Sequence, residues 1–156
     1  MKISQIIVVI LSSLSVWLSA WAASSTKPNV NDEGVILGGY DTVSYFKSDQ
    51  PQKGLSQFQV KNGESIFWFK NDENKQIFIK DPDKFKPQFD GWCAYAVADS
   101  KSKVEIDPKK FVIQDNRLFV FYNGFFGDTR NKWNKDTKAF LKKADQNWPE
   151  TKTKEP

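Results

Sequence analysis

An α+β fold is predicted, in which a small antiparallel sheet is built from two repeated β-hairpin–helix units and the helices pack on one face. The first observation is a pair of alternating apolar and polar runs in 58–69, joined by Asn62-Gly63. The second is a similar pair in 111–121, joined by Asp115-Asn116. Such dipeptides between two apolar runs indicate tight hairpin turns. A single hairpin buries too little of its large rings to be stable alone, so the two units are expected to share one core.

Helices are predicted on both sides of the first hairpin. Asp41 is expected to cap a short helix over 42–46, and Asn71 is expected to cap a helix that ends at Lys80. The dipeptide Asp81-Pro82 then starts another short helix, because proline suits the first helical position after an aspartate cap.

The second half is predicted to follow the same order. The segment 107–111 repeats the sequence pattern of 81–85, and the polar segment 99–103 is expected to be a loop. Asp128 is predicted to cap a helix that ends at Trp133, and Asp136 to cap the last helix. That helix carries Phe140, Ala144 and Trp148 on one face, and Pro149 is expected to end it.

An internal duplication accounts for these similarities. When Phe58 is aligned with Phe111, the two units match apart from an insertion, 123–127, in the second.

The chain is expected to divide into four segments. Residues 1–23 have a short basic start, an apolar stretch and the triplet Ala20-Trp21-Ala22, a pattern typical of a cleaved signal peptide. Residues 24–33 are read as a linker, 34–149 as the folded domain and 150–156 as a frayed tail. The protein is therefore expected to be periplasmic or secreted, and an uncleaved transmembrane anchor is the alternative. Membrane contact is expected only through such an uncleaved segment.

Composition removes several classes of function. The chain has 156 residues, no histidine and one cysteine, Cys93. Without histidine the commonest general base and the commonest transition-metal ligand are missing, and one cysteine cannot form an internal disulfide. The net charge of +4 comes from interspersed charges, with no basic stripe among aromatic residues, so nucleic acid is not an expected partner.

Several short motifs occur in an order that resembles the exported single-domain proteins of the YHS domain family. The motifs are Gly38-Gly39-Tyr40-Asp41, Tyr45-Phe46, Asp81-Pro82, Gly91-Trp92-Cys93-Ala94-Tyr95-Ala96, Trp133, Ala144-Asp145 and Trp148-Pro149. The resemblance covers about 34–149 and implies the YHS-like fold.

In metal-binding members of that family, two cysteines lie at the end of an aromatic strand and one helical turn later. The resemblance places these two positions on Lys70 and Asn74. A lysine ammonium repels a cation and an amide is a poor ligand for soft metals, so the zinc or copper site of those relatives is not expected here. No cofactor is therefore expected. Copper or zinc held by Cys93, with Asp41, Tyr95 or Tyr40, is the alternative.

A non-enzymatic exported binding module is the leading hypothesis, because no nucleophile–base pair, phosphate loop or carboxylate dyad is recognisable. It would hold a small ligand or an envelope protein. The predicted ligand-binding residues are Tyr40, Asp41, Trp92, Cys93, Tyr95, Phe125 and Phe126. Metal handling through Cys93 and thiol redox chemistry are the two alternatives. Each candidate also has a purely structural interpretation: Cys93 as a buried apolar residue, Asp41 as a cap, and the two phenylalanines folded over the second hairpin. The oligomeric state stays open.

Overall fold

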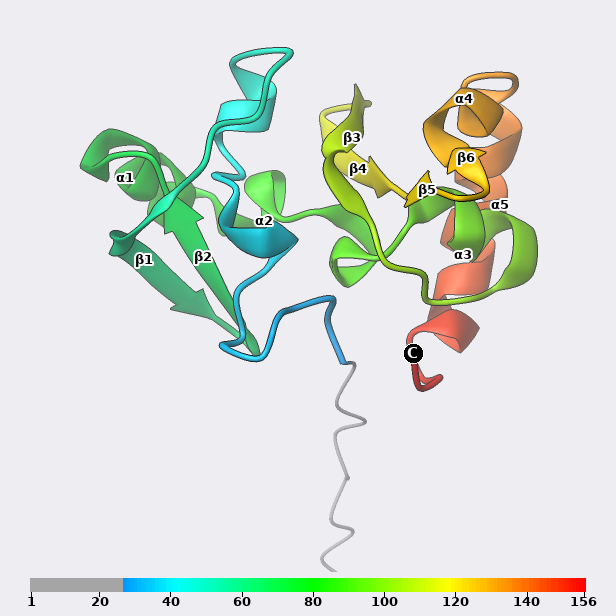
Figure 1. The fold of residues 1–156 in the computed structure, drawn as a ribbon, viewed down its shortest axis with the longest axis horizontal. Helices are drawn as coiled ribbons and strands as arrows, with labels where there is room; N and C mark the ends of the chain where they lie inside the picture. Colours follow the sequence, from blue (N-terminus) through cyan, green and yellow to red (C-terminus); the bar gives the residue numbers. More distant parts are fainter. Residues whose placement is uncertain (1–26) are drawn as a thin grey trace, which may run out of the picture.

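The computed structural model describes residues 27–156, so the predicted signal peptide and the first residues of the linker lie outside the described part (Figure 1). The described chain is a mixed α+β structure. In chain order its elements are η1 (Leu37–Gly39), η2 (Ser44–Phe46), β1 (Leu55–Asn62), β2 (Ser65–Phe69), α1 (Asp72–Lys80), α2 (Pro82–Phe85), η3 (Gln88–Gly91), α3 (Ala94–Ser100), β3 (Asp107–Gln114), β4 (Arg117–Phe121), β5 (Asn123–Gly124), β6 (Gly127–Asp128), α4 (Thr129–Trp133) and α5 (Thr137–Thr151), where η denotes a 3₁₀ helix.

The strands form three separate two-stranded antiparallel sheets in residues 27–156: β1–β2, β3–β4 and β5–β6. The expectation of one sheet shared by the two hairpins is therefore wrong. Side chains of both hairpins belong to one buried apolar cluster, but no strand of one hairpin pairs with a strand of the other. Figure 1 shows them well apart, with α1 beside β1–β2 and with α3, α4 and α5 beside the other hairpin.

The two predicted hairpins are present and share one pairing pattern. In the first, Leu55 pairs with Phe69, and a bulge precedes the regular pairing that begins at Gln59. In the second, Asp107 pairs with Phe121, and a bulge precedes the regular pairing that begins at Phe111. In this pairing pattern the residue of the first hairpin that corresponds to Phe111 is Gln59, one position after the Phe58 of the sequence comparison.

Both turns contain two residues, and they differ in that both residues of the second turn, but only Gly63 of the first, have positive φ angles. Asp115 and Asn116 both have positive φ angles, 51° and 58°, as the twist of a two-residue hairpin favours. In the first hairpin Asn62 still pairs with Ser65, and the turn begins at Gly63 with a φ of 60°. The first turn therefore lies one residue later than predicted.

The predicted helix caps are confirmed. In each case a side-chain oxygen accepts a backbone N–H of the first helical turn, which satisfies a donor that has no partner within the helix. The pairs are Asn71 with Asn74, Asp81 with Lys84, Asp128 with Arg130 and Asp136 with Ala139.

Other elements differ from the prediction. The helix expected over 42–46 is one 3₁₀ turn, and the segment 99–103, expected to be a loop, begins inside α3. The segment 107–111 opens strand β3 although its sequence resembles that of α2, because its backbone pairs with β4. Pro149 lies inside α5 and does not end it.

The buried apolar side chains form two clusters that meet at β4. Leu118 and Val120 belong to the first cluster, with Phe67, Phe69 and other residues of the first half. Phe119 and Phe121 belong to the second cluster, in which Trp133 is central. Because successive side chains of a strand point to opposite faces, β4 contributes to both clusters. The expected single core is thus two clusters joined by one buried strand.

None of the helices formed by residues 27–156 is both long and apolar enough to cross a membrane.

Candidate functional site

Asp41 is fully buried, and its carboxylate joins three segments of the first half. Oδ1 accepts the backbone N–H groups of Val43 at 2.9 Å and of Ser44 at 3.3 Å. Oδ2 accepts the backbone N–H of Lys70 at 2.9 Å and the amide Nδ2 of Asn74 at 2.6 Å. A buried carboxylate needs such donors because removing an unpaired charge from water is costly. The bonds to Val43 and Ser44 resemble those of a cap, although the N-cap residue of η2 is Val43 and not Asp41 as predicted. The bonds to Lys70, just after β2, and to Asn74 of α1 tie this turn to two further segments.

Lys70 and Asn74 both belong to this network. Asn74 also accepts a hydrogen bond from Lys47 Nζ at 2.7 Å, and Lys70 Nζ donates to Gln52 Oε1 at 3.0 Å. The four side chains line a pocket of about 260 Å³. Asp41 Oδ2 therefore links Lys70 and Asn74 beneath this pocket through hydrogen bonds.

Cys93 is fully buried in the second half, immediately before α3. Its Sγ accepts the backbone N–H of Tyr122 at 3.3 Å and lies 3.4 Å from Thr129 Oγ1. The Thr129 hydroxyl also donates to the Tyr122 carbonyl at 3.0 Å. These neighbours carry no charge, whereas reactive thiols lie in exposed, electropositive surroundings. The environment is that of a cysteine that packs and hydrogen-bonds within the fold.

The structure does not bring Asp41 and Cys93 into one site, since their hydrogen-bond partners belong to different halves of the chain. Within residues 27–156, no group of three or more cysteine, aspartate or glutamate side chains is arranged to hold a metal ion.

Trp92 and Tyr95 flank Cys93 in the sequence and have different exposures. Trp92 is buried, and its indole N–H donates to the Lys27 carbonyl at 3.1 Å. Tyr95 is half-buried, with its ring centroid 5.2 Å from that of Phe140. Burial and the adjacent carboxylate of Asp99 raise the pKa of Tyr95. Of these two aromatic residues, only Tyr95 presents part of its ring to solvent.

Tyr40 directly precedes Asp41 in the chain. Its ring is half-buried, and Lys53 Nζ lies 4.6 Å from the ring centroid. The two residues also form an isolated antiparallel bridge, so this cation–π contact closes the loop before β1.

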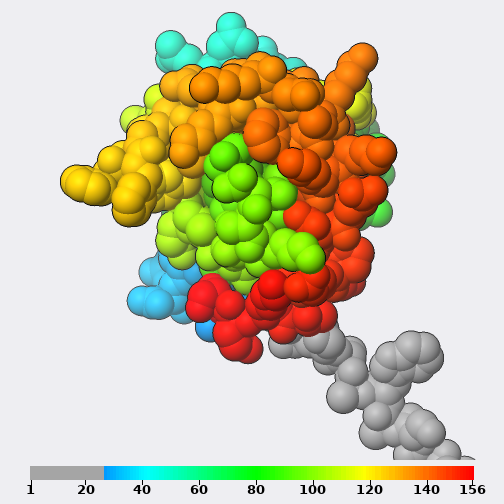
Figure 2. Space-filling model, turned by 90° about the vertical axis from the view of Figure 1, so that its right-hand side faces the viewer, coloured from blue at the N-terminus to red at the C-terminus, as the bar shows by residue number. Residues whose placement is uncertain are grey.

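Phe125 and Phe126 are the most exposed large apolar side chains among the described residues, at 95% and 77% exposed. They lie at the turn between β5 and β6, and their ring centroids are 5.3 Å apart at an interplanar angle of 87°. In Figure 2 the yellow to orange segment that contains this turn projects from the molecule. The alternative in which both rings fold back over the second hairpin is therefore wrong.

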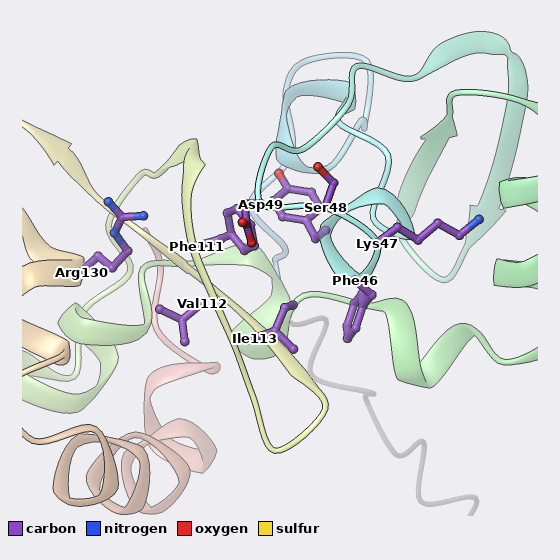
Figure 3. A pocket seen from close by; sticks show the side chains of 9 residues that line it. Phe46, Lys47, Ser48, Asp49, Phe111, Val112, Ile113 and Arg130 are labelled. Atoms are coloured by element: carbon purple, nitrogen blue, oxygen red, sulfur yellow. The ribbon is translucent and has the colours of Figure 1, made fainter.

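A groove of about 700 Å³ lies between the two halves. Figure 3 shows one wall formed by the chain around η2 and the opposite wall by β3, with Arg130 at one end. The lining residues are Tyr45, Phe46, Lys47, Ser48, Asp49, Phe111, Val112, Ile113 and Arg130. The exposed surface of the lining is more polar than apolar, and the groove is open to solvent. Its volume falls within the range of small-molecule sites.

The sequence prediction missed the groove residues. The sequence pattern predicts only apolar positions of a helix and a strand for Phe46, Phe111, Val112 and Ile113. The structure places the first in η2 and the other three in β3. These residues face the groove because β3 lies opposite η2. No sequence signal indicates which segment lies opposite β3.

Comparison with protein-family models, with curated proteins and with solved structures found no match to this chain.

Proposed function

We propose that this protein is a non-enzymatic, exported binding module that holds a small amphipathic molecule in the groove between its two halves. The groove is the observation that carries the proposal. Its volume of about 700 Å³ falls in the range of small-molecule sites, and its lining combines apolar side chains of η2 and β3 with polar and charged groups that supply most of the exposed surface. Export is inferred from the sequence of residues 1–23.

The charges at the groove suggest the chemistry of the ligand. Arg130 lies at one end (Figure 3), and its ion pair with Asp128 uses one of its two terminal nitrogens, at 3.2 Å. A guanidinium has five N–H donors, so it can also bind a carboxylate of the ligand. An apolar body would then lie along Phe111 and Ile113.

Filling the groove tests this proposal. Ser48 lines the groove and is exposed, so Ser48→Trp should obstruct it with little effect on the core. Gln50→Trp is the matched control, because Gln50 is exposed in the same loop and is not among the lining residues. With decanoate and indoleacetate as probes, saturation-transfer NMR should detect binding to the wild-type protein and to Gln50→Trp. Ser48→Trp should weaken it about tenfold or more, as the loss of ~1.4 kcal/mol would.

Two results would contradict the groove proposal. One is that neither probe binds the wild-type protein, and the other is that both tryptophan variants bind equally well. An envelope protein is the alternative occupant, and it would bind to wild-type protein but not to Ser48→Trp in a pull-down that includes Gln50→Trp.

We also propose that the two halves are copies of one YHS-like unit. Their hairpins support this, because each position of the first matches the residue 52 places later in the second, as Leu55 matches Asp107 and Phe69 matches Phe121. The bulge falls at the same place in both hairpins.

Ring packing gives a second line of support for the duplication. Phe78 packs on Phe67 and Phe69, with centroid distances of 4.6 Å and 5.0 Å. The corresponding Trp133 packs on the two matching phenylalanines of β4, each at 5.4 Å. A ring from the following helix thus covers the same two positions of each hairpin.

The backbone before each hairpin gives a third line of support for the duplication. Gly39 and Gly91, again 52 places apart, have φ angles of 81° and 82°, and the next residue but one is Asp41 or Cys93. The N–H of Asp41 donates to the Gln52 carbonyl, and the N–H of Cys93 donates to the Val104 carbonyl. Asp41 and Cys93 therefore occupy equivalent places.

Thiol redox chemistry and copper or zinc handling through Cys93 remain alternatives. Both require Sγ to leave its contacts with Tyr122 and Thr129. We expect native protein to react with a thiol reagent only as fast as it unfolds, and Phe126→Cys, whose new thiol is exposed, to gain one fast-reacting equivalent. Fast, complete reaction of Cys93 in native protein would instead support the redox alternative. Stoichiometric copper(I) or zinc that is lost in Cys93→Ser would support metal handling.

A further inference from the structure

The Phe125–Phe126 tip has no counterpart in the first half. In the first half one residue, Lys70, separates the end of β2 from the helix cap Asn71. In the second half the chain runs from Tyr122 through β5 and β6 before it reaches the cap Asp128. The cap forms in both halves, so capping does not require the extra hairpin, which carries the two exposed rings.

The tip has a convex shape. It projects from the molecule in Figure 2, and its residues do not line the groove or the other pockets described in residues 27–156. Such a projection can enter a fluid apolar medium, but it cannot enclose a small molecule. Two rings in water carry apolar area whose burial is favourable, and exposed apolar patches mark interaction surfaces.

Three basic side chains follow the tip in the sequence, and two carboxylates, Asp107 and Asp128, lie at its base. The segment 129–135 contains Arg130, Lys132 and Lys135 and no acidic residue. At the base of the tip, Asp128 is paired with Lys110 at 3.3 Å and with Arg130. Basic side chains beside exposed phenylalanines match the surface of a bilayer, where anionic headgroups lie above the acyl chains.

We propose that the Phe125–Phe126 tip inserts into the interface of a phospholipid bilayer that contains anionic lipids. This inference is independent of the groove, and it differs from the expectation that only an uncleaved first segment would contact a membrane. The rings replace water with the acyl region, and Lys132 and Lys135 meet the phosphate groups, whereas Arg130 stays paired with Asp128 beside the groove.

An environment-sensitive fluorophore on the full chain tests the insertion. It is attached to Phe126→Cys in a Cys93→Ala background, and to Glu64→Cys as the matched control, because Glu64 is exposed at the turn of the first hairpin. The probes are vesicles of phosphatidylcholine mixed with phosphatidylglycerol, and vesicles of phosphatidylcholine alone. We expect the label at 126, but not at 64, to shift to the blue with mixed vesicles and to be quenched by spin-labelled lipids.

Two further variants measure the contributions of the rings and of the charges. The double variant Phe125→Ser/Phe126→Ser should lower the tip-dependent partition about tenfold or more, because two large rings are no longer buried. The variant Lys132→Gln/Lys135→Gln should weaken partition at low salt and have less effect at high salt, since salt screens surface charges.

Two outcomes would overturn the proposal. In the first, the chain binds vesicles while the label at 126 stays in water, which would place the contact elsewhere in the chain. In the second, the label at 126 shifts to the blue without vesicles as protein concentration rises, which would identify a second copy of the chain as the partner of the tip.

Discussion

At the scale of single residues, Asp41 and Cys93 are two buried side chains with a similar hydrogen bond and different chemistry. Each accepts the backbone N–H of the residue that follows its hairpin, Lys70 or Tyr122. The carboxylate accepts four hydrogen bonds and is charged, whereas the thiol is a weaker acceptor. Asp41 should therefore contribute more to stability than Cys93.

Asp41→Asn should lower the free energy of unfolding by about 3 kcal/mol, because an amide would direct its NH₂ group at donors that now bond to a carboxylate. The matched control is Asp81→Asn, since Asp81 accepts one exposed backbone N–H and asparagine caps helices equally well. Urea denaturation measures both. Equal loss of stability in the two variants would contradict the role given to the Asp41 carboxylate.

Tyr45 should make stability depend on pH in the alkaline range. Its hydroxyl donates to the Pro108 carbonyl at 2.8 Å, and burial, with nearby Tyr40, Asp107 and Asp41, raises its pKa far above the ordinary value of 10.0. The unfolded chain loses this proton at lower pH than the folded chain does. The stabilisation is thus complete below about pH 10 and is lost as the pH rises beyond it.

Tyr45→Phe isolates this effect. The variant should be less stable than wild type by about 1 kcal/mol below pH 10, because the Pro108 carbonyl loses its donor. The difference should shrink and then reverse as the pH rises above that value. Stability curves from urea denaturation at several pH values measure it, and parallel curves for the two proteins would contradict the assignment.

At the scale of the elements, α5 shows that a proline does not always end a helix. Pro149 removes its own N–H, but the helix continues because the N–H of Lys152 donates to the Trp148 carbonyl and the Thr151 hydroxyl donates to the Asn147 carbonyl. Thr151 is fully buried. The last turn is therefore held by contacts that its sequence does not reveal.

Pro149→Ala should raise the free energy of unfolding by about 1 kcal/mol, since alanine restores a helical N–H at an exposed position. Lys142→Ala is the control, because Lys142 is exposed in the same helix and lysine and alanine have similar helix propensities. Thermal or urea denaturation compares the two. A Pro149→Ala variant no more stable than Lys142→Ala would contradict the cost that we assign to the missing N–H of Pro149.

At the scale of the whole molecule, β4 joins the two halves. Its side chains alternate between the cluster of the first half and the cluster around Trp133, and four of its five residues are buried. A disturbance of either cluster therefore reaches the same strand, and the two halves should unfold together.

Phe78→Leu, in the first cluster, and Trp133→Phe, in the second, test this coupling. Each should lower stability by roughly 1–3 kcal/mol, through loss of buried ring contacts. Each should shift one common transition, seen alike by circular dichroism and calorimetry. The appearance of two separate transitions in either variant would show that the halves fold independently.

The sequence by itself determined the local structure. Asn62-Gly63 and Asp115-Asn116 predicted both hairpins, and the caps at Asn71, Asp81, Asp128 and Asp136 predicted the helix starts, because a turn or a cap depends on residues only a few positions apart. Local patterns did not predict that 107–111 belongs to a strand or that α5 continues past Pro149. At both places contacts with distant segments outweigh the local preference.

Only the tertiary structure decided how these elements meet. It divided the expected single sheet into separate hairpins, placed Asp41 and Cys93 in different buried networks, and opened a groove between η2 and β3. It also left Phe125 and Phe126 in solvent. Apolar periodicity says which residues avoid water, but the partner of each apolar face depends on contacts between segments far apart in the chain, which no local pattern encodes.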